Sequence, residues 1–155
     1  MTHVIFSVGW LGAAAAYLAL ALAALSATDA AFVRGSYVGL ELMGWYVIVP
    51  FCLAGVAAGL IQSLGTEWGL LKHYWIATKF VITTVATAIL LGHMRTVIRA
   101  AALARADSML APENAQLRLQ LVVHAGLGLL VLLVASVLSI YKPWGRTAYG
   151  HKVRP

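Results

Sequence analysis

Two histidines and one glutamate lie at the edges of long apolar stretches, where ionisable side chains are costly and therefore indicate a functional site. His93 and His124 each lie near one end of such a stretch, and Glu41 lies near an end of a third. If successive stretches cross a membrane in alternating directions, all three residues reach a similar depth. Two imidazoles and a carboxylate can bind Zn, Fe or Cu, and two histidines with one carboxylate are typical of non-haem Fe(II) sites. His93, His124 and Glu41 are therefore the predicted metal ligands.

The same two histidines could instead be axial ligands of a b-type haem. Neighbouring helices pack about 8–10 Å apart, which is narrow for a haem held between them. Gly128, one turn from His124, leaves room for a flat ligand. A third alternative is that each histidine bonds a headgroup, a water or a carbonyl oxygen, and that no cofactor is bound.

A second and looser histidine group is expected at the opposite interface. It contains His3 and His73, and His151 is a further candidate for it. Together with His93 and His124, His3 and His73 complete the candidate set for cofactor binding. Two histidine levels would allow one haem near each interface.

A lysine inside an apolar run is the other unusual feature of the sequence. Lys72, Lys79, Ala86 and His93 are seven residues apart, which keeps them near one face of a helix. Lys79 could face the interior of a bundle, or its side chain could extend back to the interface. Glu41 has a similar alternative, as an interfacial carboxylate that faces water or pairs with Arg34.

The composition indicates a membrane protein. Of the 155 residues, 62% are hydrophobic and 10% are charged, whereas about 25% are charged in a soluble domain. The net charge of +6 is explained by contact with anionic lipid headgroups, so no nucleic acid is expected. Cys52 is the single cysteine and is interpreted as a core residue. The chain has no phosphate-binding glycine loop, HExxH or Gly-x-Ser-x-Gly motif.

The apolar runs must position these side chains. They predict an all-α polytopic protein, an up-down bundle of four transmembrane helices in a single membrane domain. Pro50 should kink the second helix, and the residues around Arg34 should form the first connection. The Lys and Arg residues are divided evenly between the two sides, and the acidic residues only weakly favour cytoplasmic termini. The predicted spans are residues 4–25, 38–61, 74–94 and 119–141, followed by a basic tail at 142–155.

Three blocks, at residues 66–75, 121–130 and 139–145, resemble small bacterial four-helix inner-membrane proteins of unknown function. The two histidine levels also resemble the layout of small di-haem b-type membrane cytochromes. The resemblance to the bacterial inner-membrane proteins implies that this chain lies in a bacterial inner (cytoplasmic) membrane.

The function predicted from these residues is redox chemistry or electron transfer, and one form of it would be a membrane oxidoreductase working with a quinone or another redox partner. The alternative is a non-catalytic membrane subunit or assembly factor without a cofactor. Gly55, Gly59 and the alanine-rich first span are small-residue faces that could form a homo-oligomer.

Overall fold

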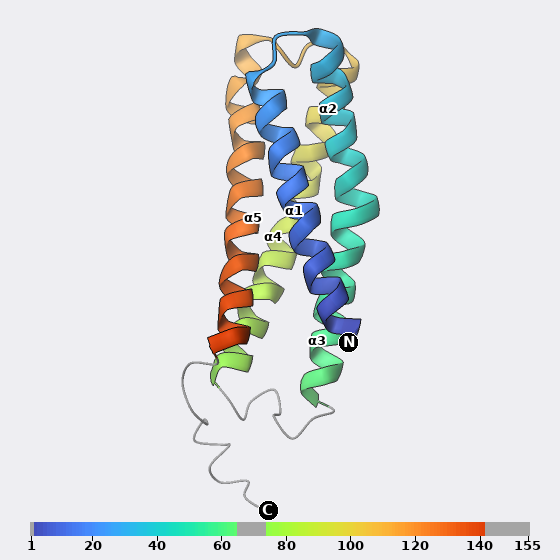
Figure 1. Cartoon of the computed structure of the whole chain (residues 1–155). Helices are drawn as coiled ribbons and strands as arrows, with labels where there is room; N and C mark the ends of the chain where they lie inside the picture. The colour runs from blue at the N-terminus through green and yellow to red at the C-terminus, as the bar shows by residue number, and fades with distance from the viewer. Residues whose placement is uncertain (1, 65–73, 142–155) are drawn as a thin grey trace, which may run out of the picture.

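A computed structural model describes residues 2–64 and 74–141. These residues form an antiparallel bundle of long helices (Figure 1), so the all-α four-helix prediction is confirmed. The α1–α2 and α4–α5 connections meet at one end of the bundle, called here the upper end, and the N-terminus lies at the other. The elements are α1 (Thr2–Ser26), α2 (Ala30–Met43), the π-helical segment η1 (Gly44–Ile48), α3 (Val49–Leu64), α4 (Tyr74–Arg105), the 3-10 turn η2 (Pro112–Asn114) and α5 (Ala115–Tyr141).

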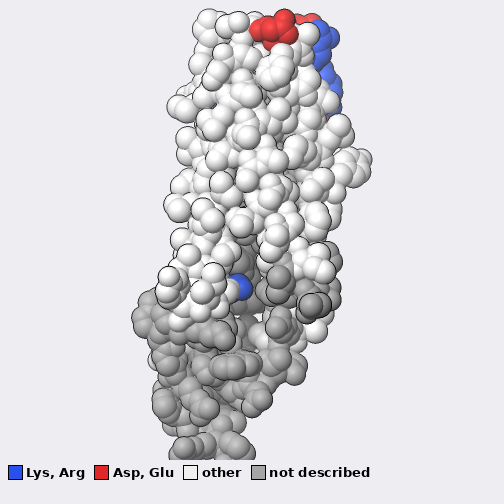
Figure 2. Space-filling model, viewed as in Figure 1, with Lys and Arg blue, Asp and Glu red and all other residues white. Residues whose placement is uncertain are grey.

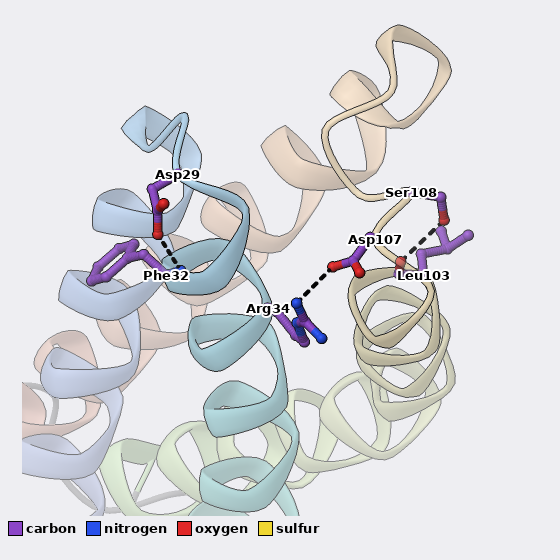
Figure 3. A network of polar contacts seen from close by, with 6 residues as sticks. All are labelled: Asp29, Phe32, Arg34, Leu103, Asp107 and Ser108. Atoms are coloured by element: carbon purple, nitrogen blue, oxygen red, sulfur yellow. Dashed lines mark hydrogen bonds and ion pairs between the residues drawn. The ribbon is translucent and has the colours of Figure 1, made fainter.

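Four helical stretches are long and apolar enough to cross a membrane. The second, third and fourth extend several residues further toward the upper end than the predicted spans. The second begins at Ala30, because Asp29 caps α2 by accepting a hydrogen bond of 2.7 Å from the Phe32 backbone N–H (Figure 3). Arg34 is therefore helical, although it was expected in a connection. α4 continues to Arg105, and its 32 residues span about 48 Å, more than a hydrocarbon core of about 30 Å.

Pro50 is the second residue of α3 and follows η1 after Val49, in the span where a kink was expected. Proline lacks a backbone N–H and so cannot bond the carbonyl four residues earlier. Here the backbone forms wider π-helical bonds, and the Val49 N–H bonds the Gly44 carbonyl. Gly44 itself is tightly packed, because a Cβ atom built there would lie 2.7 Å from Cε of Met94. Such π-helical segments frequently occur at functional sites.

The helices form a ring in which α1 contacts α5 and the α2/α3 helix, and α4 contacts the same two neighbours. Small residues such as Ala21, Ala24 and Ala104 are buried between them, which suits helix packing in lipid. Cys52 is buried, as predicted. The outer faces expose large apolar side chains, so the bundle contacts lipid. Examples are Val81, Ile89, Leu127, Leu130 and Val137.

Charged side chains gather at the upper end of the bundle (Figure 2). Arg34 of α2 pairs with Asp107 at 3.2 Å (Figure 3). Asp107 follows α4 with a positive φ of 54°, and the Ser108 N–H bonds the Leu103 carbonyl at 3.0 Å, as in a Schellman motif. The ion pair therefore fixes the start of α2 against the end of α4.

Arg118 ties the start of α5 to the end of α1. Its Nη2 donates to the carbonyl oxygens of Ala24 at 2.9 Å, Leu25 at 2.7 Å and Ala27 at 3.3 Å. The last carbonyls of a helix have no partner inside the helix. Because Arg118 supplies a charged donor to them, it acts as a C-terminal cap from another helix.

Candidate functional site

The structure brings His93 of α4 and His124 of α5 into direct contact. Their ring centroids are 4.1 Å apart, and the ring planes differ by 3°, so the imidazoles are stacked. The two residues are 31 positions apart in the sequence and meet because α4 and α5 run in opposite directions. These are the two histidines that the sequence predicts at a similar depth in the membrane.

The hydrogen bonds of the two rings differ. Nδ1 of His124 lies 2.9 Å from the carbonyl oxygen of Gln120. A carbonyl only accepts, so Nδ1 carries the hydrogen and Nε2 of the neutral ring keeps its lone pair. Nε2 of His93 is buried and has no hydrogen-bond partner among the described residues. A histidine that binds a metal usually donates its other N–H to a carbonyl or carboxylate, as His124 does here.

Two other buried side-chain atoms in the described part also lack a partner, Oη of Tyr37 and Nε of Arg118. Tyr37 and Arg118 interact electrostatically with each other. Another donor nitrogen of Arg118, Nη2, bonds three carbonyls. A guanidinium has no lone pair to offer a ligand. His93 is therefore the histidine that leaves a potential metal-binding nitrogen buried and unused.

A small cavity of about 80 Å³ lies beside the two histidines in the centre of the bundle. It has room for several waters, and it is well below the roughly 300–1,000 Å³ of pockets for larger organic ligands. Most of its lining is apolar, but Tyr17 and Met94 also contribute side chains with oxygen and sulfur atoms. The other lining residues include Trp10, Gly44, Leu90, Val97 and Gly128.

Gly128 leaves open space next to His124. A Cβ atom built there meets no atom within 4 Å, which agrees with the room expected from the sequence. In the present arrangement the faces of the two imidazoles touch each other. A haem between them would have to separate the rings, whereas an ion at the ring edges would not need a space of that size.

The structure does not bring Glu41 to the histidines. The Glu41 carboxylate forms an ion pair with Arg105. Arg34, the other partner considered for Glu41, pairs with Asp107 instead. The physical reason is the length of α4, which carries Arg105 eleven residues beyond the predicted end of its span. Within residues 2–64 and 74–141, no group of three or more His, Cys, Asp or Glu side chains could hold a metal ion.

Tyr17 and Met94 are the lining residues that the sequence argument missed. Met94 directly follows His93, and its thioether is a soft ligand of the kind that selects Cu(I). Tyr17 comes from α1, which the sequence argument treated as packing material. Their only sequence signal is that each occupies a buried position of its helix.

The second histidine group stays a prediction. His3 belongs to the first turn of α1. His73 and His151 lie outside the described residues, as do Lys72 and the basic tail. Lys79 lies about 21 Å along α4 from His93, because 14 residues separate them. It bonds Ser139 of α5 and is not part of the histidine site.

Comparison of the chain with protein-family models, with curated proteins and with solved structures gave no match. The resemblance to small four-helix membrane proteins is therefore supported at the level of architecture alone. Function has to be argued from the site itself.

Proposed function

We propose that this multi-pass membrane protein binds a transition metal ion at His93 and His124. The proposal is carried by Nε2 of His93, which is buried without a hydrogen-bond partner among the described residues and belongs to a ring stacked on a second imidazole. Leaving a buried polar atom unpaired costs about 1–3 kcal/mol. A ligand at this nitrogen would remove that cost.

Imidazole suits Zn, Cu and Fe. The ligand atoms would be Nε2 of His93 and Nε2 of His124, and the bond from His124 to the Gln120 carbonyl holds the second ring in the required tautomer. Imidazole lone pairs lie in the ring plane, so one ring must turn out of the stack for both to reach one ion. Tyr17, Met94 or a water in the adjacent cavity would complete the coordination.

An iron or copper ion at this position would make the chain a redox protein that passes single electrons between a membrane quinone and a partner protein. The bacterial inner membrane and cytoplasmic termini belong to the same proposal. A metal ion is favoured over haem because the imidazole faces touch and the cavity is small.

The test is metal analysis of the protein purified in detergent without chelators, before and after loading with each metal. We expect about one ion per chain in the wild type. His93→Ala and His124→Ala should each lower the bound metal at least about tenfold, because each removes one of two ligands. Glu41→Gln is the matched control and should retain the metal, since Glu41 is paired with Arg105.

Two results would overturn the proposal. Wild-type protein that stays colourless and takes up no Zn, Fe or Cu has no such site. A Soret band that shifts on reduction would instead establish haem, the alternative ligand of the same histidines.

The second candidate is a non-catalytic subunit or assembly factor. One observation favours it: α1 exposes small residues that follow one face of the helix, which would allow close approach of another membrane helix. These residues are Gly12, Ala15, Ala16, Ala19 and Ala23. Gly55, proposed for the same purpose, lies against Trp10 of its own chain at 3.7 Å from a built Cβ. A metal-free wild type would leave this candidate as the better one.

A further inference from the structure

Lys79 lies between α4 and α5, away from the charged upper end. Its Nζ donates to Oγ of Ser139 at 2.6 Å. The Ser139 hydroxyl in turn donates to the Ala135 carbonyl at 2.9 Å, so its oxygen is free to accept from the ammonium. The ammonium group is therefore held at a fixed place on the protein.

No carboxylate of the described residues pairs with this ammonium. The two ion pairs of the described residues are Arg34 with Asp107 and Arg105 with Glu41. An ammonium has three donors, and Ser139 accepts one of them. Because Lys79 is half-buried in an apolar bundle, its unpaired charge is costly. An anion from outside the described chain would offset this cost.

The depth of Lys79 identifies the source of that anion. Lys79 lies in the second turn of α4, which begins at Tyr74, and Ser139 lies two residues before the end of α5 at Tyr141. Both tyrosines are exposed, as is typical of residues at headgroup level. A phospholipid phosphate lies at this level and can reach the ammonium.

We propose that Lys79 and Ser139 form a binding site for the phosphate of an anionic phospholipid. Ser139 orients the ammonium, and the two remaining N–H donors bind phosphate oxygens. Lysine commonly binds phosphate as a point charge. This site is separate from the histidine pair and does not depend on whether a metal is bound there.

The experiment uses the full-length protein in detergent, titrated with phosphatidylglycerol, phosphatidylcholine or inorganic phosphate. Bound lipid is counted by native mass spectrometry, and the melting temperature is followed in parallel because a ligand that binds the folded state raises it. We expect phosphatidylglycerol to be retained and to stabilise the wild type, and phosphatidylcholine to do so less.

Lys79→Gln should weaken phosphatidylglycerol binding about tenfold through loss of the charged contact. Lys79→Arg should retain most of the binding. Arg99→Gln removes the same charge from an exposed position on the same helix and should leave binding unchanged. If Lys79→Gln does not fold, Ser139→Ala tests the same site and should weaken binding about threefold.

Two results would overturn the proposal. One is equal binding of phosphatidylglycerol by the wild type, Lys79→Gln and Ser139→Ala. The other is an equal response to phosphatidylcholine or to inorganic phosphate, which would point to zwitterionic lipid or to a free anion as the occupant.

Discussion

The upper end of the bundle and the histidine pair are two polar regions of an apolar protein, and they differ in how their polar groups are bonded. At the upper end the guanidinium groups of Arg34, Arg105 and Arg118 all have oxygen acceptors from another helix or connection. At the histidine pair, Nε2 of His93 has none among the described residues. Groups with partners join the helices, whereas an unpartnered imidazole nitrogen can offer a lone pair to a ligand. Nε of Arg118 is also buried without a partner, but a guanidinium has no lone pair to offer.

The comparison also explains the placement of Glu41. The depth argument put it with the histidines, but a carboxylate and a guanidinium attract each other strongly and form short charge-assisted bonds. Once α4 extends to Arg105, the pairing of Glu41 with this cation competes with any role as a metal ligand.

Arg118→Leu should give the largest change in stability. It removes the donor that bonds three carbonyl oxygens at the end of α1. Hydrogen bonds to charged groups contribute about 1.5–3 kcal/mol, so we expect a loss of about 3 kcal/mol in the free energy of unfolding. Unfolding in detergent measures it. Arg118→Lys keeps the charge and should lose less; a loss below about 1 kcal/mol for the leucine variant would contradict the capping role.

His93→Leu should instead raise the free energy of unfolding of the metal-free protein. The imidazole has a buried nitrogen without a hydrogen-bond partner, and the substitution puts an apolar side chain in its place. This relieves a cost of about 1–3 kcal/mol. The lost ring stacking offsets roughly 0.5–1.5 kcal/mol of this gain. We therefore expect a net increase of about 1 kcal/mol, measured by thermal unfolding after chelator treatment.

The matched variant is His124→Leu, which loses the bond to the Gln120 carbonyl and should not be stabilised. If His93→Leu destabilises the metal-free protein as strongly as Arg118→Leu, the histidine pair is a structural contact like the arginine caps, and the comparison fails.

Arg34→Gln should have the smallest effect. The side chains of Arg34 and Asp107 are 48% and 54% exposed, and exposed ion pairs contribute about 0.2–1 kcal/mol. We expect a loss of about 0.5 kcal/mol that disappears at high salt, since salt screens exposed charges. Unfolding curves at low and high salt check this. A loss that is large and independent of salt would show that Arg34 contributes through packing.

The sequence by itself determined the class of fold and the number of crossings, because the length of an apolar run reports the thickness of a bilayer. It placed the start of the second helix too late, because a polar residue such as Arg34 marks the end of an apolar run and not the end of a helix.

Only the tertiary structure decided which polar side chains meet. Depth follows from counting residues along a span, but contact also depends on how each helix is rotated about its axis, and each residue turns the direction of a side chain by about 100°. This rotation stacked His93 on His124 and placed Lys79 against Ser139. It also let Arg105 reach Glu41, because packing between helices sets rotation and hydropathy alone does not.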